Sequence, residues 1–84
     1  MLELTTKRPS MQVMVDGETC DVPLQFTARE IAAIAAAEDY TVFLFDFFGA
    51  YVKGFDQLGD ADVKALLDEW TRMREELGEP SLGE

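Results

Sequence analysis

The residues in this sequence that are best able to do chemistry are carboxylates, which occur close together at three places. These places are Glu38-Asp39, Asp60 with Asp62, and Glu75-Glu76. General acid–base catalysis would need such groups in a cleft that shifts their pKa values. All three places fall at the expected ends or exposed faces of helices, where carboxylates cap the backbone or face water. We therefore expect no catalytic residue among them.

Other kinds of chemistry lack the residues that they need. Cys20 is the only cysteine, and the chain has no histidine that would activate it as a nucleophile or join it in a zinc site. The Asp60-Ala-Asp62 spacing lacks the later ligands of a calcium loop. The sequence contains no Gly-rich phosphate loop and no pairing of serine with histidine. We predict a protein that is not an enzyme and that takes no metal or other cofactor.

The charge of the chain restricts its partners. Seventeen acidic residues against seven basic ones give the 84-residue chain a formal net charge of −10. This field repels nucleic acid phosphates and anionic membrane surfaces, so we expect neither as a partner. Acidic mimicry of DNA would need a regular array of acids, which Arg29, Lys64, Arg72 and Arg74 interrupt. A high net charge favours solubility, and it also steers a basic protein surface toward the molecule.

The expected location is the cytoplasm. The N-terminus has no apolar core segment of the kind found in signal peptides. The longest apolar stretch, residues 41–55, is too short to span a bilayer and contains Asp46 and Lys53. A single unpaired cysteine also suits a reducing compartment.

The first elements that must position these residues are two strands. Asp16-Gly17 lies between two short apolar-rich runs, and both central residues of a type I′ turn need positive φ. The sequence therefore predicts a β-hairpin within residues 1–23. Leu2 and Leu4 alternate with polar neighbours and could form a third strand, although Pro9 separates them from the hairpin.

Three helices are expected after the hairpin, over residues 27–38, 41–54 and 61–77. Thr27 and Glu30 form a capping-box pattern at the first helix. Asp39 or Thr41 is expected to cap the second helix, and Asp60 or Asp62 the third. The third helix has one apolar stripe at steps of three or four residues, formed by Val63, Leu66, Leu67, Trp70, Met73 and Leu77.

These elements predict an α+β fold, in which an N-terminal β-hairpin precedes a bundle of about three α-helices. A strand at residues 42–48 is possible on propensity alone, but residues 46–54 show no alternation and Gly54 is typical of a helix end. We expect one domain over residues 1–84, which ends in a short flexible tail at residues 78–84.

The most unusual segment is aromatic. Seven of the nine aromatic residues lie between Tyr40 and Phe55. A helix that is apolar nearly all round must be buried nearly all round, and the chain offers little else to cover it. Burying one Phe stabilises a fold by about 1.5–3 kcal/mol, so exposed rings would remove most of a small domain's stability of about 5 kcal/mol. The alternatives are a second chain that covers part of this surface, which we favour, and one closed core.

The predicted second chain is a partner protein or another copy of this one. The residues expected at that partner-binding or oligomer interface are Phe43, Phe45, Asp46, Phe47, Phe48, Tyr51, Phe55 and Trp70.

The order of these features is similar to that of a known family. The chain runs from a hairpin with Val15-Asp-Gly-Glu18, through the helix entry Pro23-Leu-Gln-Phe-Thr27, to Leu66-Leu-Asp-Glu-Trp70 and Ser81-Leu-Gly-Glu84. This layout resembles the tail assembly chaperones of long-tailed, siphovirus-type bacteriophages and prophages, and the resemblance covers nearly the whole chain. No single motif carries it.

The resemblance implies a non-enzymatic chaperone in the host cytoplasm. Such a protein coats the helical tape-measure protein, keeps it soluble, helps to recruit tail-tube subunits and tends to self-associate. The family has no catalytic residues to assign. Two other interpretations stay open: an antitoxin-like or adaptor protein that binds one partner protein, and a small virion structural or head–tail joining protein.

Overall fold

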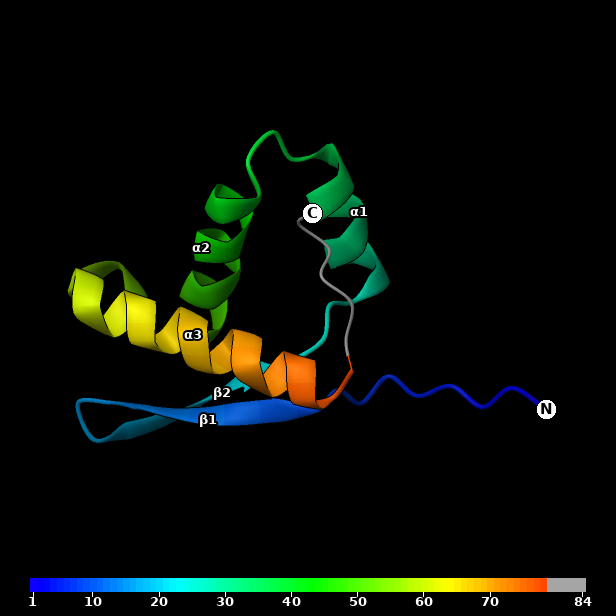
Figure 1. Cartoon of the computed structure of the whole chain (residues 1–84), viewed down its shortest axis with the longest axis horizontal. Coiled ribbons are helices and arrows are strands. Elements are labelled where there is room, and N and C mark those ends of the chain that lie inside the picture. The colour runs from blue at the N-terminus through cyan, green and yellow to red at the C-terminus, as the bar shows by residue number, and fades with distance from the viewer. Residues whose placement is uncertain (79–84) are drawn as a thin grey trace.

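The computed structural model describes residues 1–78, which form a two-stranded antiparallel sheet followed by three α-helices (Figure 1). The strands are β1 (Ser10–Val15) and β2 (Glu18–Pro23), and the helices are α1 (Ala28–Ala36), α2 (Tyr40–Tyr51) and α3 (Asp60–Glu76). A short 3-10 turn, η1 (Phe55–Gln57), precedes α3. The arrangement confirms the predicted α+β class. Residues 79–84 of the predicted tail lie outside the described residues.

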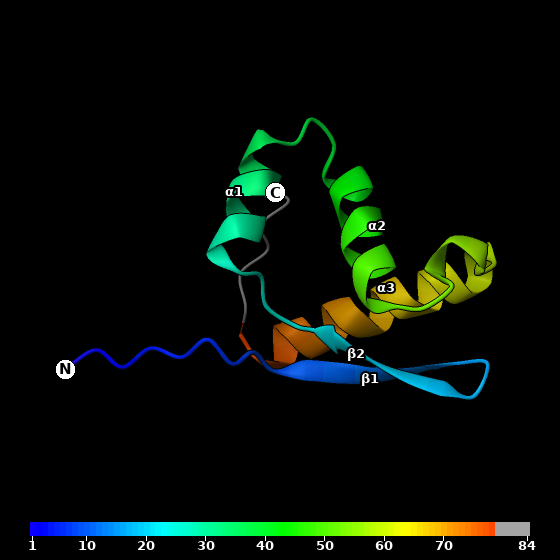
Figure 2. The ribbon, with the colours of Figure 1, turned by 180° about the vertical axis from the view of Figure 1, so that it is seen from behind.

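The hairpin forms where the Asp-Gly pair predicts it. Asp16 and Gly17 have φ values of 52° and 82°, as a type I′ turn requires, and the closing pair is Val15 with Glu18. The sheet continues as far as the pair of Ser10 with Pro23. The possible third strand at Leu2 and Leu4 does not form, and this segment leads away from the body of the molecule (Figures 1 and 2).

The helix starts are set by local side chains in two of three cases. The α1 capping box is complete, because the Glu30 backbone N–H donates to Thr27 Oγ1 at 3.2 Å and the Thr27 N–H donates to Glu30 Oε1 at 2.8 Å. Asp39 caps α2 by accepting from the Thr41 N–H at 2.8 Å. The prediction of a capping Asp at α3 was wrong. Gly59 is the N-cap residue there and makes no side-chain cap.

The ends of two helices and the place of two acidic residues also differ from the prediction. Helix α1 ends at Ala36 rather than at residue 38. Asp60 and Asp62 lie in the first turn of α3, where the positive end of the helix dipole stabilises their negative charges. Helix α2 ends at Tyr51 rather than at residue 54, because the backbone becomes extended at Val52 (φ −106°, ψ 112°). Gly54 then adopts a left-handed conformation (φ 76°) that turns the chain into η1.

The core lies between the inner face of the hairpin, α2 and α3. Helix α3 runs along the hairpin, α2 contacts β2, and α1 lies beside α2 farther from the hairpin (Figures 1 and 2). The Trp70 Nε1–H donates to the Pro23 carbonyl oxygen at 2.9 Å and joins α3 to β2. The buried apolar residues are Met11, Val22, Leu24, Phe47, Phe48, Val52, Phe55, Leu66 and Trp70. None of them comes from α1.

None of the helices within residues 1–78 combines the length and the apolar character that crossing a membrane would require.

Candidate protein-binding surface

Half of the predicted interface residues lie inside the single chain. Phe47, Phe48, Phe55 and Trp70 are buried, and Phe48 is 0% exposed. Their rings pack edge-on or tilted, with centroids of Phe48 and Trp70 at 5.1 Å. These four residues form the core, so they offer no surface to a partner of the folded chain. The alternative of a closed core holds for this part of the aromatic segment.

The other predicted interface residues reach the surface to different degrees. Phe43 and Tyr51 are half-buried, Asp46 is exposed, and Phe45 is 42% exposed. The Phe45 ring contacts the Phe55 ring edge-on at 5.6 Å, so one side of it remains open. The aromatic segment is therefore divided between an inner face and an outer face of α2.

The outer face of α2 is a stripe of exposed residues that we call the α2 ridge, formed by Val42, Phe45, Asp46 and Gly49. Val42 is 58% exposed, and a side chain added at Gly49 would meet no atom within 4 Å. These residues follow the spacing i, i+3, i+4 and i+7, which places them on one face of the helix. The ridge thus carries two apolar side chains, one carboxylate and one position flat enough for another helix to approach closely.

Val42 and Gly49 are functional candidates that the sequence-based prediction missed. The available signal was Asp46, the one charged residue within α2. A charged side chain on an otherwise apolar helix marks the side that faces water. Positions −4, −1 and +3 from Asp46 are Val42, Phe45 and Gly49, so Asp46 could have identified the whole ridge.

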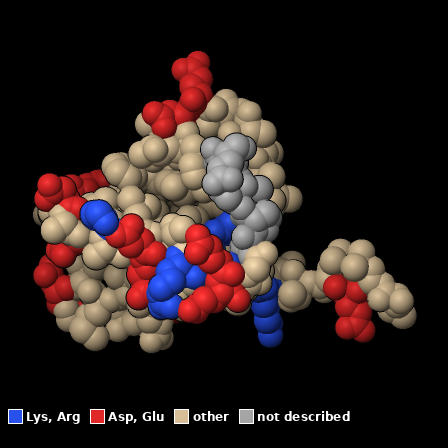
Figure 3. Space-filling model, in the orientation of Figure 1, with Lys and Arg blue, Asp and Glu red and all other residues tan. Residues whose placement is uncertain are grey.

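A shallow hollow adjoins the ridge at the connection between α1 and α2. It has a volume of about 400 Å³ and is lined by Ala37, Glu38, Asp39, Val42, Phe43 and Asp46. Its lining thus combines three apolar side chains with three carboxylates. Figure 3 shows the wider setting, in which uncharged side chains cover much of α1 and α2 and acidic ones lie at the top of this view.

Helix α1 buries none of its nine residues, and Ile31 is among the exposed large apolar side chains.

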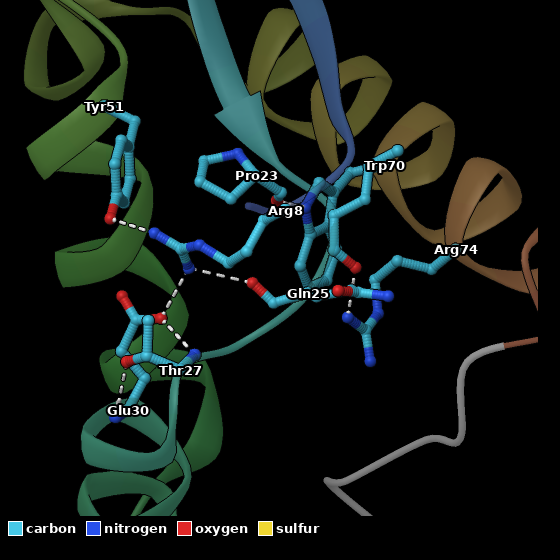
Figure 4. Close-up of polar contacts among 9 residues, drawn as sticks. Arg8, Pro23, Gln25, Thr27, Glu30, Tyr51, Trp70 and Arg74 are labelled. Atoms are coloured by element: carbon cyan, nitrogen blue, oxygen red, sulfur yellow. Dashed lines mark hydrogen bonds and ion pairs between the residues drawn. The ribbon is translucent and has the colours of Figure 1, made fainter. Parts of the chain in front are cut away.

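Arg8 holds the N-terminal end of α1 in place (Figure 4). Its guanidinium donates to Glu30 Oε1 at 2.8 Å, to the Gln25 carbonyl oxygen at 2.9 Å and to Tyr51 Oη at 2.9 Å. Burial lowers the pKa of Arg8, but the interactions with Tyr51 and Glu30 outweigh this effect and the pKa is raised. Arg8 therefore stays protonated and joins the start of α1 to the end of α2.

Arg74 is a second arginine that joins separate segments of the chain, and the residues next to it in the sequence do not indicate this role. Its side chain is buried, its Nη1 donates to the Leu24 carbonyl oxygen at 2.6 Å, and its guanidinium lies 4.9 Å from the ring centroids of Phe26 and Trp70. These contacts bind the end of α3 to the segment between β2 and α1.

The carboxylate pairs considered as catalytic candidates lie apart on the surface. Glu38, Asp39, Asp60, Asp62, Glu75 and Glu76 are all exposed. Within the described residues, no group of three or more His, Cys, Asp or Glu is arranged to hold a metal ion. The half-buried Cys20 is a free thiol on β2. What this surface offers chemically is non-covalent contact: apolar area with carboxylates beside it.

Comparison of the chain with protein-family models, with curated proteins and with solved structures gives no match.

Proposed function

We propose that this chain is a non-enzymatic tail assembly chaperone of a long-tailed phage or prophage. In this proposal it acts in the host cytoplasm, binds the helical tape-measure protein, keeps it soluble and helps to recruit tail-tube subunits. The observation that carries the proposal is the α2 ridge, on which Val42 and Phe45 remain exposed although Phe47, Phe48 and Phe55 of the same segment are buried.

The ridge suits an amphipathic helix better than a small molecule. Another helix can lie along it, with its own apolar residues on Val42 and Phe45 and its backbone close to Gly49. Full burial of a Val or Phe side chain gains about 1.5–3 kcal/mol, so covering these partly exposed residues gains roughly 2 kcal/mol in total. Such a modest gain at each contact is appropriate for a chaperone that must later release its partner.

The charges near the ridge favour a basic partner. Glu38, Asp39 and Asp46 line the adjoining hollow, and the whole chain has a formal net charge of −10. These carboxylates attract Lys and Arg on the polar face of a partner helix and raise the rate of encounter. Partner molecules that are coated with this protein repel one another through the net negative charge of the coat, which supports a role in keeping a long partner soluble.

The test is co-expression of the full chain with the tape-measure protein, and separately with the tail-tube subunit, encoded in the same genome. Size-exclusion chromatography then shows whether the chain co-elutes with either. We expect co-elution with the tape-measure protein and its loss in a V42S/F45S variant. A matched control is Leu4→Ser, which changes an exposed apolar residue on the N-terminal segment, away from the ridge, and should leave capture intact.

Folding must be checked in each variant, because the aromatic segment also builds the core. Val42 and Phe45 are exposed, so their variants should keep the circular dichroism of the parent, whereas Phe48→Ser should unfold the chain. A folded V42S/F45S variant that still captures its partner would contradict the proposed use of the ridge. A genome without a tape-measure gene near this one would contradict the phage assignment.

A further inference from the structure

We propose that the free edge of β1 is a second binding site, which takes an extended, basic segment of a partner protein as an added strand. This inference concerns a different surface from the α2 ridge and does not depend on the proposed function.

The register of the hairpin shows which backbone groups of β1 point outward. Val15 and Glu18 close the two-residue turn as a hydrogen-bonded pair, and hydrogen-bonded and non-hydrogen-bonded pairs alternate from there. The Leu24 N–H donates to the Pro9 carbonyl oxygen at 2.8 Å, as this alternation requires. Gln12 and Met14 are therefore in non-hydrogen-bonded pairs, and their N–H and C=O groups face away from β2. Within residues 1–78 the sheet has two strands, so no third strand pairs with them.

The two edges of the sheet differ in how they are protected. Sheet edges are normally guarded against strand addition by charged residues or proline. Strand β2 carries Glu18, Asp21 and Pro23, and the Pro23 carbonyl oxygen is already bonded to Trp70. Strand β1, Ser-Met-Gln-Val-Met-Val, carries no charge and no proline. The N-terminal residues leave β1 in line with it and do not turn back along its edge (Figures 1 and 2). The β1 edge is thus unprotected and uncovered by residues 1–78.

A groove lies beside this edge, between β1 and α3. It has a volume of about 460 Å³ and its lining includes all of β1 except Ser10, together with Asp16, Leu58, Asp62, Ala65, Leu66 and Glu69. An added strand would bond to Gln12 and Met14 and would place every second side chain into this groove. Val13, Val15, Leu58 and Leu66 would contact those side chains, so alternate apolar residues fit there.

The charges at the groove select a basic partner. Glu69 is paired with Arg72, but Asp16 and Asp62 make no ion pair with any other residue in the described part of the chain. Both lie near the turn end of β1, and the net charge of the whole chain adds to their attraction for a cation. The occupant that we infer is therefore an extended segment with apolar side chains at alternate positions and Lys or Arg between them. A second copy of this acidic chain fits less well.

The experiment uses the full chain, labelled with ¹⁵N, and a capped peptide that alternates valine and lysine. We expect the amide signals of Gln12 and Met14 to shift and to gain protection against hydrogen exchange when the peptide binds. A peptide that alternates valine and glutamate is the matched control and should not bind. Because Asn-Gly also supports the type I′ turn, a D16N/D62N variant should fold and should bind the lysine peptide about tenfold more weakly.

A backbone variant separates strand addition from general attraction to an acidic protein. Gln12→Pro removes an outward N–H but no hydrogen bond within the hairpin, and it should abolish protection at Met14. If the lysine peptide binds this variant as well as the parent, or shifts only residues outside β1 and α3, the inference is wrong. It is also wrong if the chain alone forms dimers in which Gln12 and Met14 are protected, because the edge then belongs to a second copy.

Discussion

At the scale of single residues, two arginines with different surroundings illustrate how position decides the effect of a charge. Arg74 is 7% exposed and lies over the rings of Phe26 and Trp70, while Arg72 forms exposed ion pairs with Glu69 and Glu76. Both are on α3, two positions apart. The first contributes through buried hydrogen bonding and stacking, and the second only through charges that water screens.

We predict that Arg74→Ala lowers the free energy of unfolding by about 3 kcal/mol, because it removes the stacking and takes the guanidinium donor from the buried Leu24 carbonyl oxygen. Urea denaturation followed by circular dichroism measures this loss without relying on Trp70 fluorescence, which the substitution itself would alter. Arg72→Ala is the matched control and should leave the midpoint nearly unchanged. Equal losses in the two variants would contradict the assigned role of Arg74.

These arginines also show why part of the site could not be predicted from sequence. The hydrogen bond from Arg74 to Leu24 spans 50 positions, and that from Arg8 to Tyr51 spans 43. Patterns within a few residues carry no information about such partners. The division of the aromatic residues into core and surface has the same origin, because it depends on where the hairpin and α3 lie around α2. Asp46 is the exception, since its charge alone marks the exposed side of that helix.

At the scale of elements, the predictions succeeded where the signal was local. Asp16-Gly17 fixes the hairpin, and Thr27 with Glu30 fixes the start of α1, because each pair satisfies the backbone beside it. The end of α2 and the cap of α3 were less well predicted. Gly54 could end α2 or turn the chain beyond it, and Asp60 could cap α3 or lie in its first turn, so the local pattern does not choose between these roles.

Helix α1 is the element held most weakly. A nine-residue helix is not stable alone in water, and α1 buries none of its residues, so we expect it to open before the rest of the chain unfolds. Ala33→Gly destabilises a helix interior by roughly 1 kcal/mol, and hydrogen exchange of the α1 amides should therefore be about fivefold faster. The urea midpoint should stay the same, because α1 is already open at the global transition.

The control for this prediction is the same substitution on α3. Ala65→Gly lies within a helix that contributes Leu66 and Trp70 to the core, so it should lower the urea midpoint. A matching fall in the midpoint of Ala33→Gly would mean that α1 unfolds together with the core, and that its exposed side chains are firmly held.

At the scale of the whole molecule, repulsion between carboxylates opposes folding. The formal net charge is −10, and ion pairs within the described residues join Arg8, Lys53, Lys64 and Arg72 to carboxylates. Most acidic residues of the described part of the chain take no part in these ion pairs, so the excess of negative charge leaves a net repulsion among them. Added salt shortens the Debye length from about 30 Å at 0.01 M to about 8 Å at 0.15 M, which screens this repulsion more than it weakens the few close pairs.

We therefore predict that the urea midpoint rises when sodium chloride is raised from about 0.01 M to about 0.15 M. Glu75→Gln should raise the midpoint at the lower salt concentration, because Glu75 lies at the negative end of the α3 dipole within an acidic surface. The same variant should differ little from the parent at the higher concentration, since the repulsion that it relieves is then already screened. A midpoint that falls with salt would mean that attractive pairs dominate, and the acidic surface would then need another explanation than solubility and the attraction of basic partners.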